Sequence, residues 1–557
     1  MSIPVVLAQL LVQRQLADSL KADAFLHPHV EQCHSPWLMR GMDAAVQRLD
    51  QALSQHDRVV VFGDYDADGT VGAVLLYRFF KRLGLRAQYF IPDRFTCGYG
   101  LNEPVLQRLR ERGTDLIVTV DNGSTAVSEV EVARRLGMDI IITDHHQLGE
   151  ELPDCAALVN PNQPGCPYPF KGLCGTGVAY KLAQAFDQHL EANDYWKESG
   201  YLRPELERDL DLVGFATIAD RMPLLDENRY LVKEGLRLMN PCLRPGMQAL
   251  VQASGVRGAV TPSVLSHKLV PKINSVGRMD NPALGAKLFL ARSLSEARRY
   301  ANLLLELNRE RQNVEQEVWR SALDQAYRQA NNAALILMDP SWHPGVMGSI
   351  AARAAHMFNK TTFALTLSPL CSEGPDRQLA IGSARVSGNL DLCEMLSGVA
   401  DLLEKFGGHP AAAGVSLFCE NLTPFRERMT QAVEERESAP DQVPLEEPAV
   451  DAWLRPEEFN ADLAQGLLDL SPFGMNNPEP ILGVRHARVE RSKIFGGQHV
   501  KFWFRGARQV ECIAWNLADS LSDVKGPVDL IISPQVYGRT CQEQMIQFRA
   551  LEVRPAD

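Results

Sequence analysis

The chain has 557 residues, a formal net charge of −12, 45% hydrophobic residues and 23% charged residues. At ~150 residues per domain, this length predicts three or four domains of ordinary globular composition. No apolar run approaches the ~20 residues of a membrane span, which argues against a membrane protein. The acidic charge neither demands nor excludes a nucleic-acid partner, because phosphate binding depends on local basic patches.

Two further features of the composition indicate a cytoplasmic protein. The apolar segment 3–12 is short and lacks the basic leader and small-residue cleavage site of a signal peptide. Eleven cysteines are scattered without a Cys-x-x-Cys pair. An odd number without a framework predicts reduced thiols, and the densest group, Cys155, Cys166 and Cys174, does not have the spacing of a zinc site.

After a short helical lead-in, an apolar run at 59–62 reaches Gly63 and then three aspartates at alternate positions, Asp64, Asp66 and Asp68. If this stretch is extended, the aspartates share one side at a spacing of ~6.6 Å. At an effective dielectric of ~20, two carboxylates that far apart repel by about 2.5 kcal/mol. A hard divalent cation such as Mg²⁺ or Mn²⁺ would remove this repulsion; an acidic turn exposed to water is the alternative.

Segments further along alternate between strand and helix at the spacing of an α/β fold. Such alternation predicts a parallel sheet that is covered on both faces. Strands are expected at 87–91, 116–120, 138–142 and 157–159, and helices at 71–83, 103–112 and 125–136.

Polar residues follow the carboxyl ends of three of these strands, where parallel sheets collect ligands. The first strand leads to the three aspartates, the strand 116–120 leads to Asp121, and the strand 138–142 leads to Asp144, His145 and His146. An apolar helical segment, 212–220, ends in Asp220, for which a C-terminal turn residue is the alternative to a further metal ligand. The sequence therefore predicts a metal site at one rim of the sheet.

The second half contains two more units. A capping box at Ser293–Glu296 begins a glycine- and proline-free helix that runs to about residue 330 and would span ~55 Å. Residues 333–440 form a second α/β unit, and the segment 434–448, rich in Glu and Pro, is expected to be a linker. Short strands and Gly or Pro turns then predict a small β-barrel.

One strand of that barrel, 499–505, alternates strictly between apolar and polar residues. Val500, Phe502 and Phe504 suit the core, and Lys501, Trp503 and Arg505 share the outer face. A basic and aromatic face is typical of a surface that binds single-stranded nucleic acid, and a solvated edge strand is the alternative.

These motifs, taken together, resemble the DHH phosphoesterase superfamily. The motifs are Asp64–Gly69, Asp121–Gly123, Asp144–His146 and Asp220. The segment 407–414, Gly-Gly-His-Pro-Ala-Ala-Ala-Gly, resembles the GGHxxAAG pattern of the companion DHHA1 domain, and 382–387 resembles its SAR strand. With the segments 274–278 and 342–348 and the barrel, nearly the whole chain is similar to the RecJ family of single-strand-specific exonucleases, without the extra C-terminal domain of some longer relatives.

The resemblance implies an α/β fold. In it a parallel-sheet DHH domain is joined by a long helix to a smaller α/β DHHA1 domain, which a C-terminal OB-fold β-barrel follows. The expected parts are a helical lead-in at 1–45, a DHH catalytic domain at 46–290, a connecting helix at 291–330, a DHHA1 substrate-binding domain at 331–440 and an OB-fold single-strand-binding domain at 441–557.

The resemblance further implies a metal-dependent 5′→3′ exodeoxyribonuclease that releases 5′-mononucleotides from single-stranded DNA in DNA repair and recombination. Two ions, Mn²⁺ or Mg²⁺, would be held by Asp64, Asp66, Asp68, Asp121, His145 and Asp220. Asp66 and Asp121 are the candidates for a bridging carboxylate. His146 would contact the scissile phosphate, and Asp144 would orient a histidine through its ring N–H.

Substrate contacts are expected from both later units. The expected contacts are Arg278, His343, Ser383, Arg385, Gly407, Gly408, His409, Lys501 and Trp503. For Arg278 the alternative is a helix-surface cation, and for the Gly-Gly-His segment it is an ordinary turn. Partners implied by the resemblance are single-stranded DNA, a single-strand-binding protein and a RecQ-type helicase, with no membrane, for a monomer in the cytoplasm.

Two other functions fit parts of the sequence. A small-substrate DHH phosphodiesterase would need neither the barrel nor the long helix. A non-catalytic DNA-binding scaffold would not need the complete set of Asp and His residues. Both therefore explain less of the chain than the exonuclease does.

Overall fold

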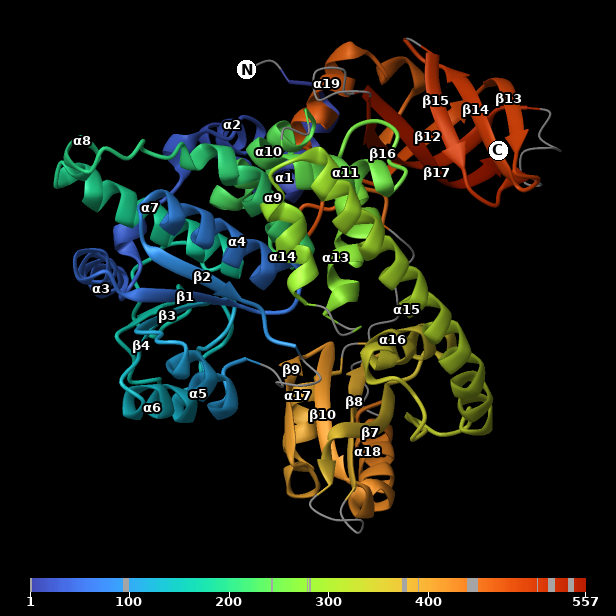
Figure 1. Ribbon diagram of the computed structural model, residues 1–557. Helices are drawn as coiled ribbons and strands as arrows, with labels where there is room; N and C mark the ends of the chain where they lie inside the picture. Colours follow the sequence, from blue (N-terminus) through green and yellow to red (C-terminus); the bar gives the residue numbers. More distant parts are fainter. Residues whose placement is uncertain are drawn as a thin grey trace.

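The computed structural model describes most of the chain. The described residues are 3–93, 100–241, 244–277, 279, 282–372, 378–388, 390–437, 449–507, 509–518, 526–538 and 545–556. They form three sheets, two of them in α/β units and one in the C-terminal barrel, and the long helix α15 (Leu294–Arg328) links the two α/β units (Figure 1). Of the helices described, none is long and apolar enough to cross a membrane.

The first unit is a five-stranded parallel sheet in the order β2-β1-β3-β4-β5. Helices α3, α4 and α7 cover one face, and α5 and α6 cover the other. The strands are β1 (Arg58–Gly63), β2 (Arg86–Phe90), β3 (Leu116–Val120), β4 (Asp139–Thr143) and β5 (Ala157–Val159). The covering helices are α3 (Met42–Gln55), α4 (Ala67–Arg82), α5 (Glu103–Glu111), α6 (Val127–Arg135) and α7 (Gly175–Ala192).

A helical layer completes this unit beside α4 and α7 and carries the chain to α15. Its apolar residues are continuous with the core of the sheet. The helices are α8 (Tyr195–Glu198), α9 (Leu210–Ala219), α10 (Asp226–Met239), α11 (Pro245–Ala253), α12 (Pro262–Val264), α13 (Val270–Val276) and α14 (Ala283–Leu290).

Helix α4 begins four residues earlier than predicted, and the three aspartates do not lie in an extended run. Asp66 is the N-cap, and its carboxylate accepts hydrogen bonds from the backbone N–H groups of Asp68 and Gly69. A Cβ on Gly69 would lie 2.3 Å from the backbone nitrogen of Asp64, so only glycine allows the helix to start so close to the strand. A side-chain cap thus replaces the expected extended geometry.

The predicted N-cap of α15 is present, since Ser293 Oγ accepts the N–H of Glu296, but the Glu296 carboxylate accepts the N–H of Arg292 and not that of Ser293, so the capping box is incomplete. The second α/β unit is a mixed sheet in the order β6-β7-β8-β10-β9. Its elements are β6 (Leu335–Met338), α16 (Met347–Phe358), β7 (Thr362–Ser372), β8 (Gln378–Arg385), α17 (Leu392–Ser397), β9 (Lys405–His409), β10 (Ala412–Phe418) and α18 (Leu422–Glu437). Helices α17 and α18 pack on one face, and α16 covers only the β7 and β8 part of the other.

Two predictions for this unit need correction. Gly407, Gly408 and His409 lie in the edge strand β9 and not in a loop, because their backbone pairs with β10. The predicted linker begins too early, since Glu434 to Glu437 form the last turn of α18; residues 438–448 lie outside the described residues.

The barrel is a seven-stranded sheet in the order β11-β12-β16-β17-β15-β14-β13, with helix α19 (Ala461–Leu470) packed against it. The strands are β11 (Ala452–Leu454), β12 (Leu482–Ala487), β13 (Val489–Phe495), β14 (His499–Arg505), β15 (Gln509–Ala514), β16 (Val528–Tyr537) and β17 (Met545–Pro555). The predicted alternation in β14 is confirmed, because Val500, Phe502 and Phe504 are fully buried.

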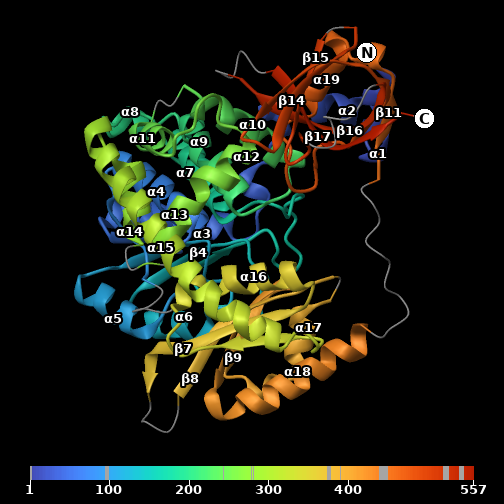
Figure 2. The same cartoon turned by 90° about the vertical axis from the view of Figure 1, so that its right-hand side faces the viewer.

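The predicted N-terminal lead-in is not a unit of its own. Helices α1 (Val5–Gln13) and α2 (Ser19–Leu26) belong to the hydrophobic core of the barrel, whereas α3 packs on the first sheet (Figure 2). The segment 3–41 therefore runs from the core of the C-terminal barrel to the first sheet. We call residues 14–34 the N-terminal arm below.

Candidate metal centre

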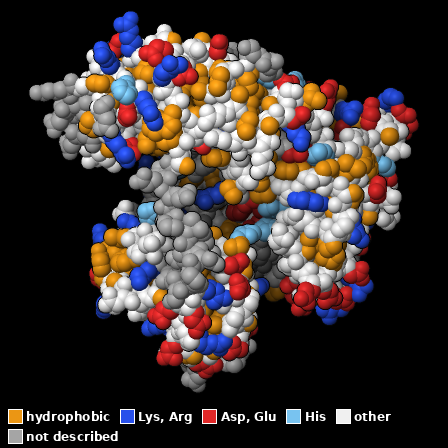
Figure 3. All heavy atoms as spheres, turned by 180° about the vertical axis from the view of Figure 1, so that it is seen from behind, with side chains coloured by type: hydrophobic (Ala, Val, Ile, Leu, Met, Phe, Trp, Pro, Cys, Tyr) orange, Lys and Arg blue, Asp and Glu red, His pale blue; other side chains and the backbone are white. Residues whose placement is uncertain are grey.

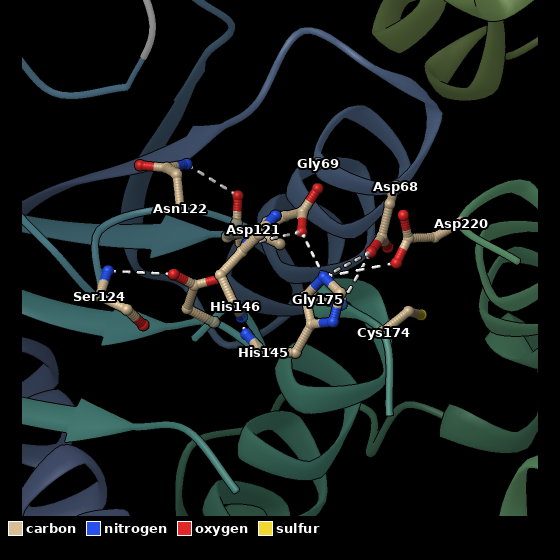
Figure 4. A network of polar contacts seen from close by, with 12 residues as sticks. Asp68, Gly69, Asp121, Asn122, Ser124, His145, His146, Cys174, Gly175 and Asp220 are labelled. Atoms are coloured by element: carbon tan, nitrogen blue, oxygen red, sulfur yellow. Dashed lines mark hydrogen bonds and ion pairs between the residues drawn. The ribbon is translucent and has the colours of Figure 1, made fainter. Parts of the chain in front are cut away.

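The carboxyl ends of β1, β3 and β4 lie side by side, because these strands are neighbours in one parallel sheet. The loops that follow them carry the predicted aspartates and histidines, and α9 brings Asp220 to the same place. Figure 4 shows the side chains of Asp68, Asp121, His145 and Asp220 pointing toward one another. Seen from behind, acidic and histidine side chains line a hollow between the two α/β units (Figure 3).

Distances between ligand atoms are short enough for metal coordination. His145 Nε2 lies 3.0 Å from Asp121 Oδ1, 3.4 Å from Asp220 Oδ2 and 4.0 Å from Asp68 Oδ2. Within the described residues, three groups have ligand atoms within 4.8 Å of one another. The groups are Asp64, Asp66 and Asp121; Asp68, His145 and Asp220; and Asp121, Asp144, His145 and His146. Asp121 belongs to two groups, which makes it the better of the two bridging candidates.

Asp68 is held by the N-terminus of α7. Its two carboxylate oxygens accept the N–H groups of Gly175 and Thr176 at 2.7 and 2.8 Å. A helix N-terminus favours a negative charge. A Cβ on Gly175 would lie 2.5 Å from the Cβ of Asp121, so the glycine lets α7 approach both aspartates.

Asp121 adopts a strained backbone conformation. Its φ is +66°, in the left-handed region that residues other than glycine rarely occupy. Its N–H donates to Thr143 O at 3.0 Å, and its carboxylate is almost fully buried. This turn directs the side chain back over the end of the sheet, toward His145.

The loop after β4 is fixed by residues that the sequence motifs did not reveal. Asn160 donates to the carbonyl of His146 at 2.9 Å, and Asn162 donates to the carbonyl of His145 at 2.6 Å. Asp144 accepts the ring Nδ1–H of His146 at 2.8 Å and the N–H of Ser124 at 3.0 Å. The two asparagines follow the strand β5, which is the parallel neighbour of β4. This position was the only feature of the sequence that could have predicted their contact with the histidine loop.

A residue of the segment 274–278, for which the sequence indicated no such role, supports the aspartate loop. Asn274, in α13, accepts the N–H of Ala67 at 2.8 Å. A Cβ on Gly277 would lie 2.5 Å from the ring of Tyr65, so this end of α13 packs directly on the segment between Asp64 and Asp66. The segment 274–277 therefore positions the aspartates.

The charges of the cluster fit divalent cations. Burial and the neighbouring carboxylates, Asp68 foremost, raise the pKa of Asp66 and Asp121 above their usual values. The same causes raise the pKa of Asp220 to about 8. Carboxylates this close to one another are stable together only with protons or cations among them. Oxygen and imidazole donors suit Mn²⁺ and Mg²⁺.

The two histidines differ in their protonation. Burial lowers the pKa of His145, which favours the neutral ring that binds metals. Burial also lowers the pKa of His146, but its hydrogen bond to Asp144 and the nearby carboxylates outweigh this and raise it to about 9. Near neutral pH, His146 is therefore a cation with its ring oriented by Asp144.

The open face of the second sheet carries the predicted substrate residues. The strand register places Ser383, Gly414 and Gly407 side by side across β8, β10 and β9. Among the described residues, no atom lies within 4 Å of the Cβ that Gly407 lacks. His409, one row away on the same face, is close enough to His145 for its charge to contribute to the lowered pKa of that residue.

Two more predicted residues, Arg385 and His343, lie with Ser383 at the N-terminal end of α16. A Cβ on Gly348 would lie 3.3 Å from Arg385 Nη2 and 3.6 Å from Ser383 Oγ. His343 Nδ1 accepts the N–H of Gly345 just before the helix. Backbone N–H groups at this helix end, with the guanidinium and the hydroxyl beside them, form a group suited to phosphate. Arg278 lies outside the described residues.

The outer face of β14 is partly neutralised within the barrel. Lys501 Nζ lies 2.7 Å from Glu511 Oε1, and the ring N–H of Trp503 donates to Glu511 Oε2 at 3.1 Å. The guanidinium of Arg491 lies 4.0 Å from the centre of the Trp503 ring. The predicted basic and aromatic face exists, but other side chains of the barrel already engage it.

Comparison with known proteins agrees with this architecture. The model for "DHH family, N-terminal domain" matches residues 58–205, "DHHA1 domain" matches 331–435, and "RecJ OB domain" matches 450–549. RecJ of Dickeya dadantii is 33% identical over 532 residues, which are 93% of this chain and 90% of that protein. RecJ of Escherichia coli is 34% identical over 87% of this chain and 85% of that protein. The chain spans 62% of the Bacillus subtilis RecJ, which is 36% identical.

Solved structures share this fold over all or most of the chain. The crystal structure of RecJ from Thermus thermophilus in complex with Mn²⁺ matches all of this chain and 76% of that one, with a TM-score of 0.78 at 27% identity. A structure of exonuclease RecJ bound to manganese matches 72% of this chain with a TM-score of 0.59 at 31% identity. The predicted fold class is confirmed, and the chain belongs to the RecJ family of DHH proteins.

Proposed function

We propose that the chain is a metal-dependent 5′→3′ exonuclease that removes 5′-mononucleotides from single-stranded DNA in DNA repair and recombination. The observation that carries the proposal is the convergence of Asp64, Asp66, Asp68, Asp121, His145 and Asp220 at one rim of the first sheet. When bound, two Mn²⁺ or Mg²⁺ ions would supply an activated water and neutralise charge on the phosphate and the leaving oxygen.

The chain's own residues would orient the substrate at this centre. His146, cationic and held by Asp144, would donate a hydrogen bond to an oxygen of the scissile phosphate. Asp121, the carboxylate shared by two of the ligand groups of the described residues, is the proposed bridging carboxylate. The backbone N–H groups at the start of α7 hold the Asp68 carboxylate, whose Oδ2 lies 4.0 Å from His145 Nε2.

The second α/β unit would set polarity and strand specificity. Ser383 and Arg385, which belong to β8 and lie beside the start of α16, would bind the 5′ phosphate. His343, His409 and Arg278 would make further contacts. The floor of Gly407 and Gly414 would let a nucleotide lie against the backbone, and Gly408, beside it in β9, allows the close approach of β10. A hollow of this kind between two rigid units would admit one strand and exclude a duplex.

The decisive experiment is digestion of single strands labelled at the 5′ or the 3′ end, as DNA and as RNA, with Mn²⁺ or Mg²⁺. We expect labelled mononucleotide from the 5′ end and a loss of about a thousandfold or more, roughly 4 kcal/mol, for Asp121→Ala. Release from the 3′ end would contradict the proposed polarity. Preference for di- or trinucleotides would favour a small-substrate phosphodiesterase, and binding without release would favour a scaffold.

A Gly407→Val variant tests the floor of the substrate site. Its side chain would occupy open space, so the fold should be retained. The valine would fill the volume proposed for the nucleotide, and we expect kcat/KM to fall by about 100-fold, as for a misplaced substrate. Wild-type activity in this variant would show that the nucleotide lies elsewhere.

The family resemblance also supports a set of partners that we propose for testing. These are a single-strand-binding protein and a RecQ-type helicase, acting with a cytoplasmic monomer. Light scattering of the purified chain would test the oligomeric state, and titration with each purified partner would test the complexes.

A further inference from the structure

A buried arginine of the first α/β unit, which carries the metal centre and is called the catalytic unit below, contacts the barrel. Arg229, in α10, is 1% exposed. Its Nη2 donates to the carbonyls of Asp469, Leu470 and Ser471 at 2.8, 2.9 and 3.0 Å, which lie at the C-terminal end of α19. The carbonyls at a helix C-terminus have no partner within the helix and attract a cation. Arg229 thus caps a helix of another domain.

The same side chain also binds the N-terminal arm. Its Nε donates to the carbonyl of Phe25, and its guanidinium lies 3.6 Å from the centre of the Phe25 ring. Phe25 belongs to the hydrophobic core of the barrel. Among the described residues, no carboxylate forms an ion pair with Arg229, and burial lowers its pKa to about 9. Carbonyl dipoles and an aromatic ring therefore offset the cost of burying this charge.

A second contact joins the same two parts near the metal centre. The N–H of Leu224 donates to the carbonyl of Met475 at 2.9 Å, and a Cβ on Gly474 would lie 2.8 Å from Leu224 Cδ1. Both contacts involve one short stretch of the catalytic unit, 220–229, whose first residue is Asp220. The barrel's segment 469–475 is thus docked directly on the segment that supplies a metal-centre carboxylate.

We propose that Arg229 is a positioning residue that holds the barrel in a fixed orientation to the metal centre, so that one strand can occupy both at once. The inference rests on the proposed nuclease function. A strand held at two sites gains affinity through the effective concentration of the second site, which falls when the geometry between the sites is loose. Short substrates, which reach only the metal centre, gain nothing from the barrel.

The test is steady-state kinetics of the full chain with Arg229→Met on a trinucleotide and on a strand of about 30 nucleotides, longer than the site of one OB fold. We expect KM for the long strand to rise about tenfold with unchanged kcat, and both constants for the trinucleotide to stay within about twofold. A loss of stability alone would move both substrates alike, so a parallel change, or none, overturns the proposal.

Two further variants complete the experiment. Lys233→Met removes a cation one turn along α10 that, within the described part of the chain, donates a hydrogen bond only to the carbonyl of Leu26 in the N-terminal arm. It should leave the long-strand KM within about twofold, and a loss equal to that of Arg229→Met would overturn the role of the α19 carbonyls. Gly474→Val disturbs the Leu224 contact without touching the buried charge, and it should reproduce the length-dependent loss even if Arg229→Met does not fold.

The outcomes separate this inference from the proposed function. A wild-type chain that hydrolyses neither substrate overturns the nuclease function and the inference with it. An active wild type whose preference for long strands survives both Arg229→Met and Gly474→Val overturns the inference alone.

Discussion

The metal centre and the outer face of β14 are both rich in charged side chains, but the protein treats their charge in opposite ways. At the metal centre, backbone N–H groups hold the Asp68 carboxylate and asparagines hold the backbone of the histidine loop, while several carboxylates are left repelling one another. On β14, Glu511 neutralises Lys501, and Arg491 covers Trp503. Carboxylates that repel one another in fixed positions indicate a site that requires a cation. Charged side chains that are already paired with one another, as on β14, indicate a surface that can only contribute binding.

The first test of this comparison removes a hydrogen-bond acceptor that holds the metal centre in place. Asp144→Asn weakens the hold on His146 and on the loop after β4, and loss of such an outer contact costs about 10–100-fold in activity or metal affinity. Hydrolysis rates over a Mn²⁺ titration measure both. The matched control is Asp139→Asn at the other end of β4, where the side chain is exposed and pairs with Arg48. An equal loss in the two variants would contradict the proposed role of Asp144.

The unresolved repulsion itself predicts a pH dependence. The pKa of Asp220 is about 8 in the metal-free fold and near its ordinary low value when unfolded. The folded state therefore binds the extra proton between these values, and the metal-free protein loses stability as pH rises toward 8. We expect the Mn²⁺-induced increase in Tm to be a few degrees larger at pH 8.5 than at pH 6.

The control for this pH dependence is Asp220→Asn, which removes the titrating group. Calorimetry of the wild-type chain and the variant, each with and without Mn²⁺, gives the four curves required. If the metal-induced shift is equal at both pH values in the wild-type chain, the carboxylates do not repel one another as the structure indicates.

The smallest effect is expected on the barrel. Base stacking on an aromatic side chain contributes about 1–3 kcal/mol, but Trp503 already stacks with Arg491, so we expect Trp503→Ala to raise the long-strand KM by about fivefold. Lys501→Ala should act similarly, with turnover of trinucleotides unchanged. Glu511→Gln should strengthen long-strand binding by about twofold, because it releases Lys501. Weaker binding in Glu511→Gln would show that the pairing orders the face for DNA.

The local signals in the sequence determined which strands form the first sheet and which residues follow them. Apolar β-branched runs separated by helices specify a parallel sheet, and strand ends in such a sheet meet at one edge, so the gathering of Asp64, Asp121 and His145 followed from pattern alone. The alternation in β14 and the Ser293 N-cap of α15 also depend only on local spacing.

Tertiary structure decided what local spacing cannot encode. Whether Asp66 caps a helix or lies in a strand depends on the close approach of Gly69 to Asp64. The support from Asn160 and Asn162 depends on the pairing of β5 with β4, and that from Asn274 depends on a contact with Ala67, 207 positions away. The path of the N-terminal arm into the barrel core and the reach of Arg229 into α19 join residues more than 200 positions apart. Such contacts arise from the packing of whole domains, in which a buried polar group must find its partner wherever the fold places one.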